Sequence, residues 1–458
     1  MNKKFVLPFL LSSTVILATG CNDNSDKDNK VITQPVITPS SSLTGLASED
    51  QINAEKQALE FINTPESQAA LKLKAADLLQ IAKSNGTEID DYNLTLLDQA
   101  IQETTFASAL SLYNNDKSNE KIISILAAAH TWFGVNALGS RTVFDNPDTT
   151  YRTIPIDTNV SYVIKGTANS KLPLDVNFSL WDKNNQTLSN LATSDLVRNK
   201  DGSFEIYVSK QSAPSTYANY IQLKDTATSI FIRNTINDWK NQQFDKLSIE
   251  RAEGSKRIPI ITKDDQYKSF LSNLTSAGPA YNYYYKLSNA PSVNTLPELT
   301  LGGTEGRLST QAATYSPFHI EDDEALIFTT TLGDANYFIL PVYNQWFITT
   351  NYIHKTQTLN NAQSLANADG SYTYVISKKD PGIYNWIDTD GLNHGYLNPR
   401  WQGLSGNPNQ ALPTALLKLV KLVDLKNELP SGIKLVNEAE RKTQLELRKK
   451  SYELRYTP

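Results

Sequence analysis

Apolar positions in the N-terminal part of the chain recur with the spacing of amphipathic helices. A capping-box pattern and a Thr-Pro pair mark the starts of the first two helical stripes. Segments 91–114 and 119–137 continue with a similar spacing of apolar residues. We therefore expect residues 48–138 to form a helical module in which four helices close a small bundle.

From about residue 140 the apolar period changes from that of a helix to two. Val176, Phe178 and Leu180 alternate with polar residues, and a later run from Phe204 to Val208 behaves in the same way. Gly, Asn and Asp clusters punctuate these runs, which is typical of an antiparallel β-sandwich. The patterns divide the remainder of the chain into a first β-sandwich at 139–262, a connector at 263–295, a second β-sandwich at 296–410 and C-terminal helices at 411–458.

The two β-rich regions look like copies of each other. Short similar strings occur in the same order in both, at offsets between 164 and 171 residues. The clearest is Asp201-Gly202-Ser203 against Asp369-Gly370-Ser371, where Asp-Gly indicates a turn into the following strand. Tyr151 with Tyr315, and Arg233 with Arg400, belong to the same series. We therefore predict an α+β protein with two repeated antiparallel sandwiches.

The N-terminus has the layout of a bacterial lipoprotein signal. Two lysines, an apolar run and the small-residue box Ala18-Thr19-Gly20 precede Cys21, the only cysteine of the chain. We expect residues 1–20 to be removed and Cys21 to be acylated, with palmitate or a related chain, so that lipid is the membrane partner. Residues 21–47 are polar and read as a disordered tether. An ordinary secretory signal or a buried thiol are the alternatives.

Location and binding partners follow in part from composition. The residue after Cys21 is Asn22 rather than Asp, which favours the outer membrane over the inner one. The net charge of −5 gives no electrostatic footprint for nucleic acid. The four histidines have no metal-ligand spacing, and no nucleophile elbow, P-loop or dinucleotide fingerprint occurs. We therefore expect no metal and no cofactor.

Several of these strings resemble a bacterial family known only as domain of unknown function 1214, often found beside the 1254 family. The resemblance rests on Asn146-Pro147-Asp148 with Tyr151 and Arg152, on the first Asp-Gly-Ser turn, and on the stretch from Asp380 to Trp401. It extends over roughly 130–458, including a Leu/Val-rich helix after Pro413 and a basic final helix. The resemblance implies a jelly-roll-like β fold and no established activity.

The second repeat holds the best candidate site. It gathers six functional side chains within 22 residues: Asp380, Asn385, Trp386, Asp388, Arg400 and Trp401. Carboxylates and an arginine could hold an acid or a sugar hydroxyl, with either tryptophan as an apolar platform. Asp380 and Asp388 could instead perform acid–base chemistry, as in glycoside hydrolysis. A third interpretation is a structural corner built from ion pairs and a buried ring.

These observations favour an envelope lipoprotein that binds or scaffolds a glycan or small ligand. Asn385, Trp386, Asp388, Arg400 and Trp401 are the expected ligand contacts. The alternative function is a carboxylate-dependent hydrolase or lyase that uses Asp380 and Asp388.

Overall fold

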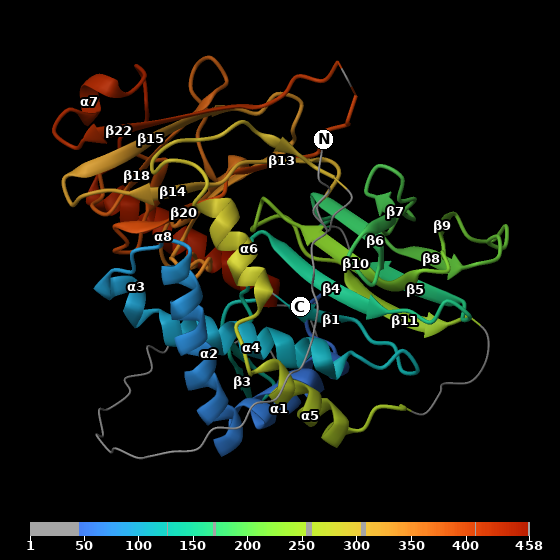
Figure 1. Ribbon diagram of the computed structural model, residues 1–458. Coiled ribbons are helices and arrows are strands. Elements are labelled where there is room, and N and C mark those ends of the chain that lie inside the picture. Colours follow the sequence, from blue (N-terminus) through green and yellow to red (C-terminus); the bar gives the residue numbers. More distant parts are fainter. Residues whose placement is uncertain are drawn as a thin grey trace, which may run out of the picture.

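The computed structural model describes residues 45–125, 127–167, 171–252, 259–303, 308–407 and 409–456. The predicted lipidation site Cys21, the signal segment and most of the predicted tether lie outside the described residues. Within the described ranges, no helix combines the length and the apolar character needed to cross a bilayer. The fold is α+β, as predicted, with N-terminal helices, two β-sandwiches and C-terminal helices (Figure 1).

The N-terminal helices begin at well-formed caps. Ser48 and Thr64 each accept a hydrogen bond from the third backbone N–H that follows them, as their positions predicted. Alanines and larger apolar residues on the inner faces pack the helices together, with Ala54, Ala58 and Leu78 fully buried. The helices are α1 (Glu49–Ile62), α2 (Pro65–Ser84), α3 (Asp91–Thr95) and α4 (Leu97–Tyr113).

The predicted helix at 119–137 is wrong. This segment forms β1 (Ile123–Ile125), which pairs with the first sandwich, and a hairpin of β2 (His130–Trp132) and β3 (Val135–Ala137). Phe133 and Gly134 both have positive φ, at 47° and 76°, as a two-residue hairpin turn of the primed type requires. The apolar spacing imitated a helix, but the turn and the β-branched residues determined the structure.

The first sandwich packs a five-stranded sheet, in the order β1-β4-β10-β6-β7, over a smaller sheet, β11-β5-β8-β9. Its interior is a separate apolar cluster that includes Ile164, Phe178, Ile206 and Ile230, all fully buried. The strands are β4 (Thr149–Pro155), β5 (Tyr162–Thr167), β6 (Asp175–Asp182), β7 (Thr187–Ala192), β8 (Phe204–Ser209), β9 (Asn219–Gln222), β10 (Ala227–Thr235) and β11 (Lys246–Arg251).

Helices α5 (Lys263–Asn273) and α6 (Pro279–Ser288) form the connector and return the chain to the N-terminal helices (Figure 1). The second sandwich follows. Its strands are β12 (Thr300–Leu301), β13 (Gln311–Ala313), β14 (Ser316–His319), β15 (Glu324–Thr331), β16 (Tyr337–Tyr343), β17 (Thr358–Asn360), β18 (Tyr372–Ser377), β19 (Trp386–Asp388), β20 (His394–Leu397), β21 (Arg400–Gln402) and β22 (Thr414–Lys421). Short 3₁₀ turns occupy Asn361–Gln363 and Leu454–Tyr456.

A second prediction, the helix after Pro413, is also wrong. The Leu/Val-rich segment after Pro413 is not a helix, because all eight of its residues pair antiparallel with β15. Ala415, Leu417 and Leu419 alternate with residues of the opposite face, which is the period of a strand. Two helices then follow, α7 (Leu425–Glu428) and α8 (Glu438–Glu453). The basic residues Arg441 and Arg448 of α8 are buried rather than facing solvent.

The predicted repeat is visible in the strand order. The sheet β22-β15-β18-β19 matches β11-β5-β8-β9, including a last pair that is parallel in both, β8 with β9 and β18 with β19. The two Asp-Gly-Ser turns also share their hydrogen bonds. Asn199 N–H donates to the Ser203 carbonyl and Asn367 N–H to the Ser371 carbonyl, both at 2.7 Å. The two sandwiches therefore share their topology and their turn chemistry.

Candidate functional site

Asp380 and Trp386 bind the C-terminal helix. The Asp380 carboxylate accepts hydrogen bonds from Nε and Nη2 of Arg441, at 2.8 and 3.1 Å. The Arg441 guanidinium lies 5.0 Å from the centre of the Trp386 ring, and the indole N–H donates to the Ser377 carbonyl. Trp386 is buried, so its ring offers no open platform. These two candidate residues hold α8 against the second sandwich.

The side-chain oxygen and nitrogen of Asn385 both form hydrogen bonds with backbone groups. Its side-chain oxygen accepts from Leu365 N–H at 2.9 Å, and its amide group donates to the carbonyls of Leu365 and Thr373. Asn219 makes the same three bonds in the first repeat, to Val197 and Glu205. The shared geometry ties a loop to the start of the parallel strand in each sandwich.

Asp388 belongs to a different group of charges. Its carboxylate lies 3.5 Å from Lys355 Nζ, which is 2.7 Å from Asp390. Burial raises the pKa of Asp388, and the nearby Lys355 ammonium opposes that rise. Asp390 has a positive φ of 54°, and its backbone carbonyl accepts a bond from the Tyr92 hydroxyl of α3. The predicted acid–base pair is therefore split, because Asp380 faces Arg441 and Asp388 faces Lys355.

Arg400 and Trp401 are neighbours on β21 that point to opposite faces of the sheet. The Trp401 ring lies in the sandwich interior against Phe338, and its indole N–H donates to Thr330 Oγ1 at 3.1 Å. Arg400 points out of the sandwich and donates to the Asp145 carbonyl and to the Tyr343 hydroxyl. The six predicted residues therefore do not converge on one point.

Arg400 lies instead in a cluster of tyrosines where the two sandwiches meet. It is 6% exposed, and its Nε has no hydrogen-bond partner among the described residues. Burial lowers the pKa of Arg400, but the oxygens of Tyr343, Tyr151 and Tyr337 raise it by more. Tyr315 adds to the same effect. We call Arg400, Tyr151, Tyr315, Tyr337 and Tyr343 the junction cluster.

The junction cluster joins the two repeats, because Tyr151 comes from β4 and the other members from the second sandwich. The sequence pattern indicated Arg400 as a site residue but did not indicate the tyrosines. A usable signal was present, since Tyr151 with Tyr315 and Arg233 with Arg400 are pairs of the internal repeat. In the first repeat, the Arg233 guanidinium lies over the rings of Phe231 and Trp181, 4.7 and 5.5 Å from their centres.

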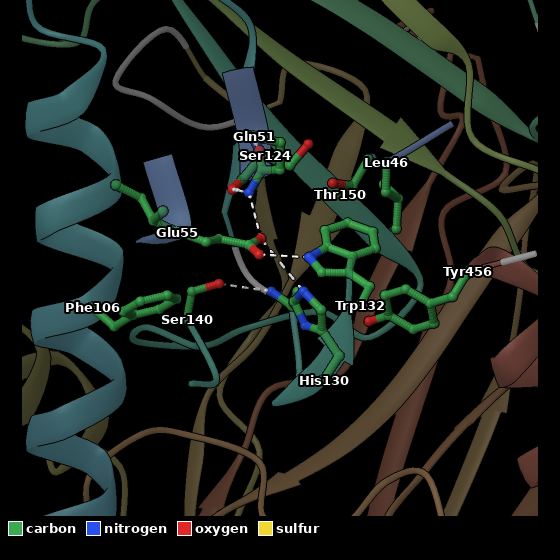
Figure 2. Close-up of a pocket in the computed structure, with 12 residues that line it drawn as sticks. Leu46, Gln51, Glu55, Phe106, Ser124, His130, Trp132, Ser140, Thr150 and Tyr456 are labelled. Atoms are coloured by element: carbon green, nitrogen blue, oxygen red, sulfur yellow. Dashed lines mark hydrogen bonds and ion pairs between the residues drawn. The ribbon is translucent and has the colours of Figure 1, made fainter. Parts of the chain in front are cut away.

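A second polar group surrounds a small cavity in the helical module (Figure 2). Figure 2 shows His130 and Trp132, from one hairpin strand, pointing toward Glu55 of α1. The indole N–H of Trp132 donates to Glu55 at 2.6 Å, and His130 Nε2 lies 3.4 Å from the other carboxylate oxygen. Burial lowers the pKa of His130, but the Glu55 carboxylate raises it by more. The cavity measures about 20 Å³, which is enough for one water molecule.

Two histidines that are distant in sequence meet in the structure. The rings of His319 and His394 stack with their centres 3.9 Å apart, since β14 and β20 are paired with these residues in register. Burial and the neighbouring His319 lower the pKa of His394. Within the described ranges, no group of three or more His, Cys, Asp or Glu side chains is arranged to hold a metal ion.

The comparisons with known proteins agree with the observed architecture. A family model described as a protein of unknown function, DUF1214, matches residues 175–234. We call residues 175–234, which match this model, the DUF1214 segment. This segment runs from β6 to the end of β10 in the first sandwich, a smaller part of the chain than the resemblance suggested. A comparison with curated proteins found no match.

Two solved structures are similar to this chain over a longer stretch than the length of the DUF1214 segment. An uncharacterized protein from Burkholderia cenocepacia has a TM-score of 0.63 at 19% identity, covering 80% of this chain and 99% of its own. The VPA0106 protein from Vibrio parahaemolyticus has a TM-score of 0.41 at 12% identity, covering 60% of this chain and 90% of its own. The first likeness supports the fold and carries no information on function.

Proposed function

We propose that this chain is a binding protein of the bacterial envelope that recognises a small anionic ligand, or an anionic unit of a glycan, at the junction cluster. Lipid on Cys21 would anchor it, with the outer membrane as the favoured location. Arg400 is the central ligand contact in this proposal. The observation that carries it is a buried guanidinium that faces phenol oxygens and no carboxylate.

A buried charge is costly unless an opposite charge compensates it. Arg141 and the largely buried Arg198 have carboxylate partners, Glu103 and Asp245, whereas the buried Arg152, Arg448 and Arg455 donate to neutral oxygens, as Arg400 does. Among the described residues, no carboxylate oxygen lies within 4 Å of the Arg400 nitrogens, in contrast to those pairs. A bound carboxylate or phosphate would supply the missing charge, and the planar guanidinium suits such groups.

The tyrosines fit the same class of ligand. Tyr151 and Tyr315 are partly exposed, whereas Tyr337 and Tyr343 are fully buried behind them. A partly exposed phenol combines an apolar ring face with a hydroxyl donor, which suits a sugar or another small polar ligand. A uronic-acid unit would combine the charge for Arg400 with ring faces for the tyrosines.

The hydrolase alternative receives less support from the geometry. Asp380 accepts two hydrogen bonds from Arg441, and Asp388 lies beside Lys355. Acid–base chemistry on a glycosidic bond needs two carboxylates that flank one bond. Here each carboxylate is held by a different cation on a different element.

The test is ligand binding by the purified protein and two arginine variants. Thermal shift and calorimetry with glucuronate, acetate and inorganic phosphate should show stabilisation of the wild type, about 2.7 kcal/mol at a concentration of 100 Kd. Arg400→Gln should lose this response while the circular dichroism spectrum is kept. Arg233→Gln, the equivalent change in the first repeat, is the matched control and should retain it. Binding that survives in Arg400→Gln, or no binding by the wild type, would overturn the site.

The membrane anchor is tested separately. Cys21→Ser should move the protein from the detergent phase to the aqueous phase on phase partitioning. An unchanged distribution would remove the lipid anchor from the proposal and leave the ligand site unaffected.

A further inference from the structure

Strand β22 is an edge strand with an unusual number of exposed apolar side chains. It lies at the end of the sheet β19-β18-β15-β22 and pairs only with β15 among the described strands. Leu416 is 72% exposed and Leu419 is 42% exposed, and Val423 just beyond the strand is 86% exposed. Long apolar edges invite pairing with another strand, and natural sheets usually protect them.

The hydrogen bonds of Thr414 show which backbone groups face outward. Its N–H donates to Thr331 Oγ1 at 3.2 Å, and its carbonyl accepts from Thr330 Oγ1 at 2.7 Å, both on β15. Because backbone groups alternate along a strand, the N–H and C=O groups of Ala415, Leu417 and Leu419 point to the open edge. This edge can therefore accept another antiparallel strand.

The equivalent edge of the first sandwich is polar. Strand β11 takes the place of β22, and the strand pairings align Ser248 with Leu416. Its exposed positions carry Lys246, Ser248 and Glu250, and Glu250 pairs with Lys165. The fold does not require an exposed leucine at this position, since the first copy forms the same edge strand with a serine there.

We infer that β22 pairs antiparallel with β22 of a second copy of this chain, across a two-fold axis at Leu416. In this register Leu416 faces Leu416 of the second copy, and Ala415 faces Leu417 of the second copy. The outward groups of Ala415 and Leu417 then form reciprocal hydrogen bonds, and the small sheets of the two copies become one continuous sheet. Such an isologous contact closes at two subunits.

A second copy in this register brings no like charges together. Lys418 faces Thr414 of the second copy, so no lysine opposes a lysine. Centring the pair on Lys418 would bring two ammonium groups together, which is unfavourable. Both lysines of the strand are already paired within the chain, Lys418 with Glu428 and Lys421 with Asp323 and Glu324. They are therefore not unpaired charges that would repel an incoming strand.

The first measurement is the mass of the purified Cys21→Ser protein in solution, by light scattering during size exclusion. We expect a dimer that dissociates on dilution. Leu416→Ser copies the first repeat and should give a monomer with an unchanged circular dichroism spectrum, since the side chain is exposed. Leu447→Ser, at another exposed leucine on α8, is the control and should stay dimeric. A monomeric parent protein at all concentrations, or a dimeric Leu416→Ser, would overturn the inference.

Disulfide formation tests the register. Directly opposed residues that do not share hydrogen bonds have Cα atoms about 4.5 Å apart, within the range of a disulfide. In the Cys21→Ser background, Leu416→Cys should form an intermolecular disulfide on mild oxidation, whereas Lys418→Cys should not. The reverse pattern would reject the proposed axis, and crosslinking of neither variant would reject the strand pairing.

Discussion

The two sandwiches share a topology but differ in how each interior is filled at one end. Asn234 of β10 and Trp401 of β21 directly follow the repeated arginines Arg233 and Arg400, and both side chains point inward. Asn234 is fully buried in a polar network, whereas Trp401 is fully buried among aromatic rings. The same backbone arrangement thus encloses a polar network in one copy and an apolar cluster in the other.

The polar network of the first sandwich consists of hydrogen-bonded groups around Asp245. Arg198 donates two parallel hydrogen bonds of 2.9 Å to the Asp245 carboxylate, and Asn234 accepts from the Asp245 N–H at 2.7 Å. Arg152 donates to the Asp245 carbonyl, and burial lowers its pKa to about 10. A buried network of this kind is stable only while every member keeps its partners.

Trp401→Ala should be the most damaging change in this comparison. Removal of a buried tryptophan costs about 3–5 kcal/mol through lost burial and a cavity. Asn234→Ala should cost less, about 1–3 kcal/mol, because it leaves the Asp245 N–H unpaired without creating a large cavity. Urea denaturation followed by circular dichroism measures both. Equal losses would mean that the two interiors depend on the same kind of interaction.

The junction between the sandwiches should respond to pH through Asp145. Its carboxylate accepts two hydrogen bonds from Thr349, and its carbonyl accepts from Tyr343. Burial raises the pKa of Asp145 from 3.8 to about 6, although Arg141 nearby opposes the rise. The folded state thus binds this proton more tightly than the unfolded chain. The stability that the proton contributes is present below pH 4 and lost as pH rises through about 6.

Asp145→Asn separates this effect from other titrations. The free energy of unfolding of the wild type should fall relative to the variant by up to about 3 kcal/mol between pH 4 and pH 7, at about 1.4 kcal/mol per pKa unit. Denaturation curves at several pH values measure the difference. Parallel pH profiles for the two proteins would contradict a raised pKa for Asp145.

The repeat was the most informative feature of the sequence, and it fixed the correspondence of turns and strands correctly. Short strings such as Asp-Gly-Ser predict turns because the local chemistry decides their conformation. The predictions of helices at 119–137 and after Pro413 were wrong, because apolar spacing alone does not reveal which strand a segment pairs with. Ile123 pairs with β4, and Thr414 pairs with β15, both across distant sequence. Long-range pairing overrode the local pattern.

The site was harder to predict than the fold. Closeness in sequence suggested that Asp380, Asp388 and Arg400 act together, but each faces a different partner in space. Neighbouring residues on a strand point to opposite faces of the sheet, so the side chains of Arg400 and Trp401 cannot contact the same ligand. The Asp380 carboxylate pairs with Arg441 of the distant helix α8 rather than with a residue of its own stretch of sequence. Only a tertiary arrangement could show this exchange.

The smallest expected difference between the two copies concerns Asn219 and Asn385. Each bridges one backbone N–H and two carbonyls, with bonds of 2.7 to 3.0 Å. Replacement of either by alanine should cost about 1–3 kcal/mol, because buried backbone groups lose their partners. The two losses should agree within about 0.5 kcal/mol in urea denaturation, since the bonds are equivalent.

Ligand binding decides whether Asn385 does anything more than Asn219. Because its amide is occupied by Leu365 and Thr373, folded Asn385→Ala should bind the anion of the junction cluster as tightly as folded Asn219→Ala. Calorimetry at a temperature where both variants are folded makes the comparison. A selective loss of affinity in Asn385→Ala would return this residue to the ligand site and break the equivalence of the two copies.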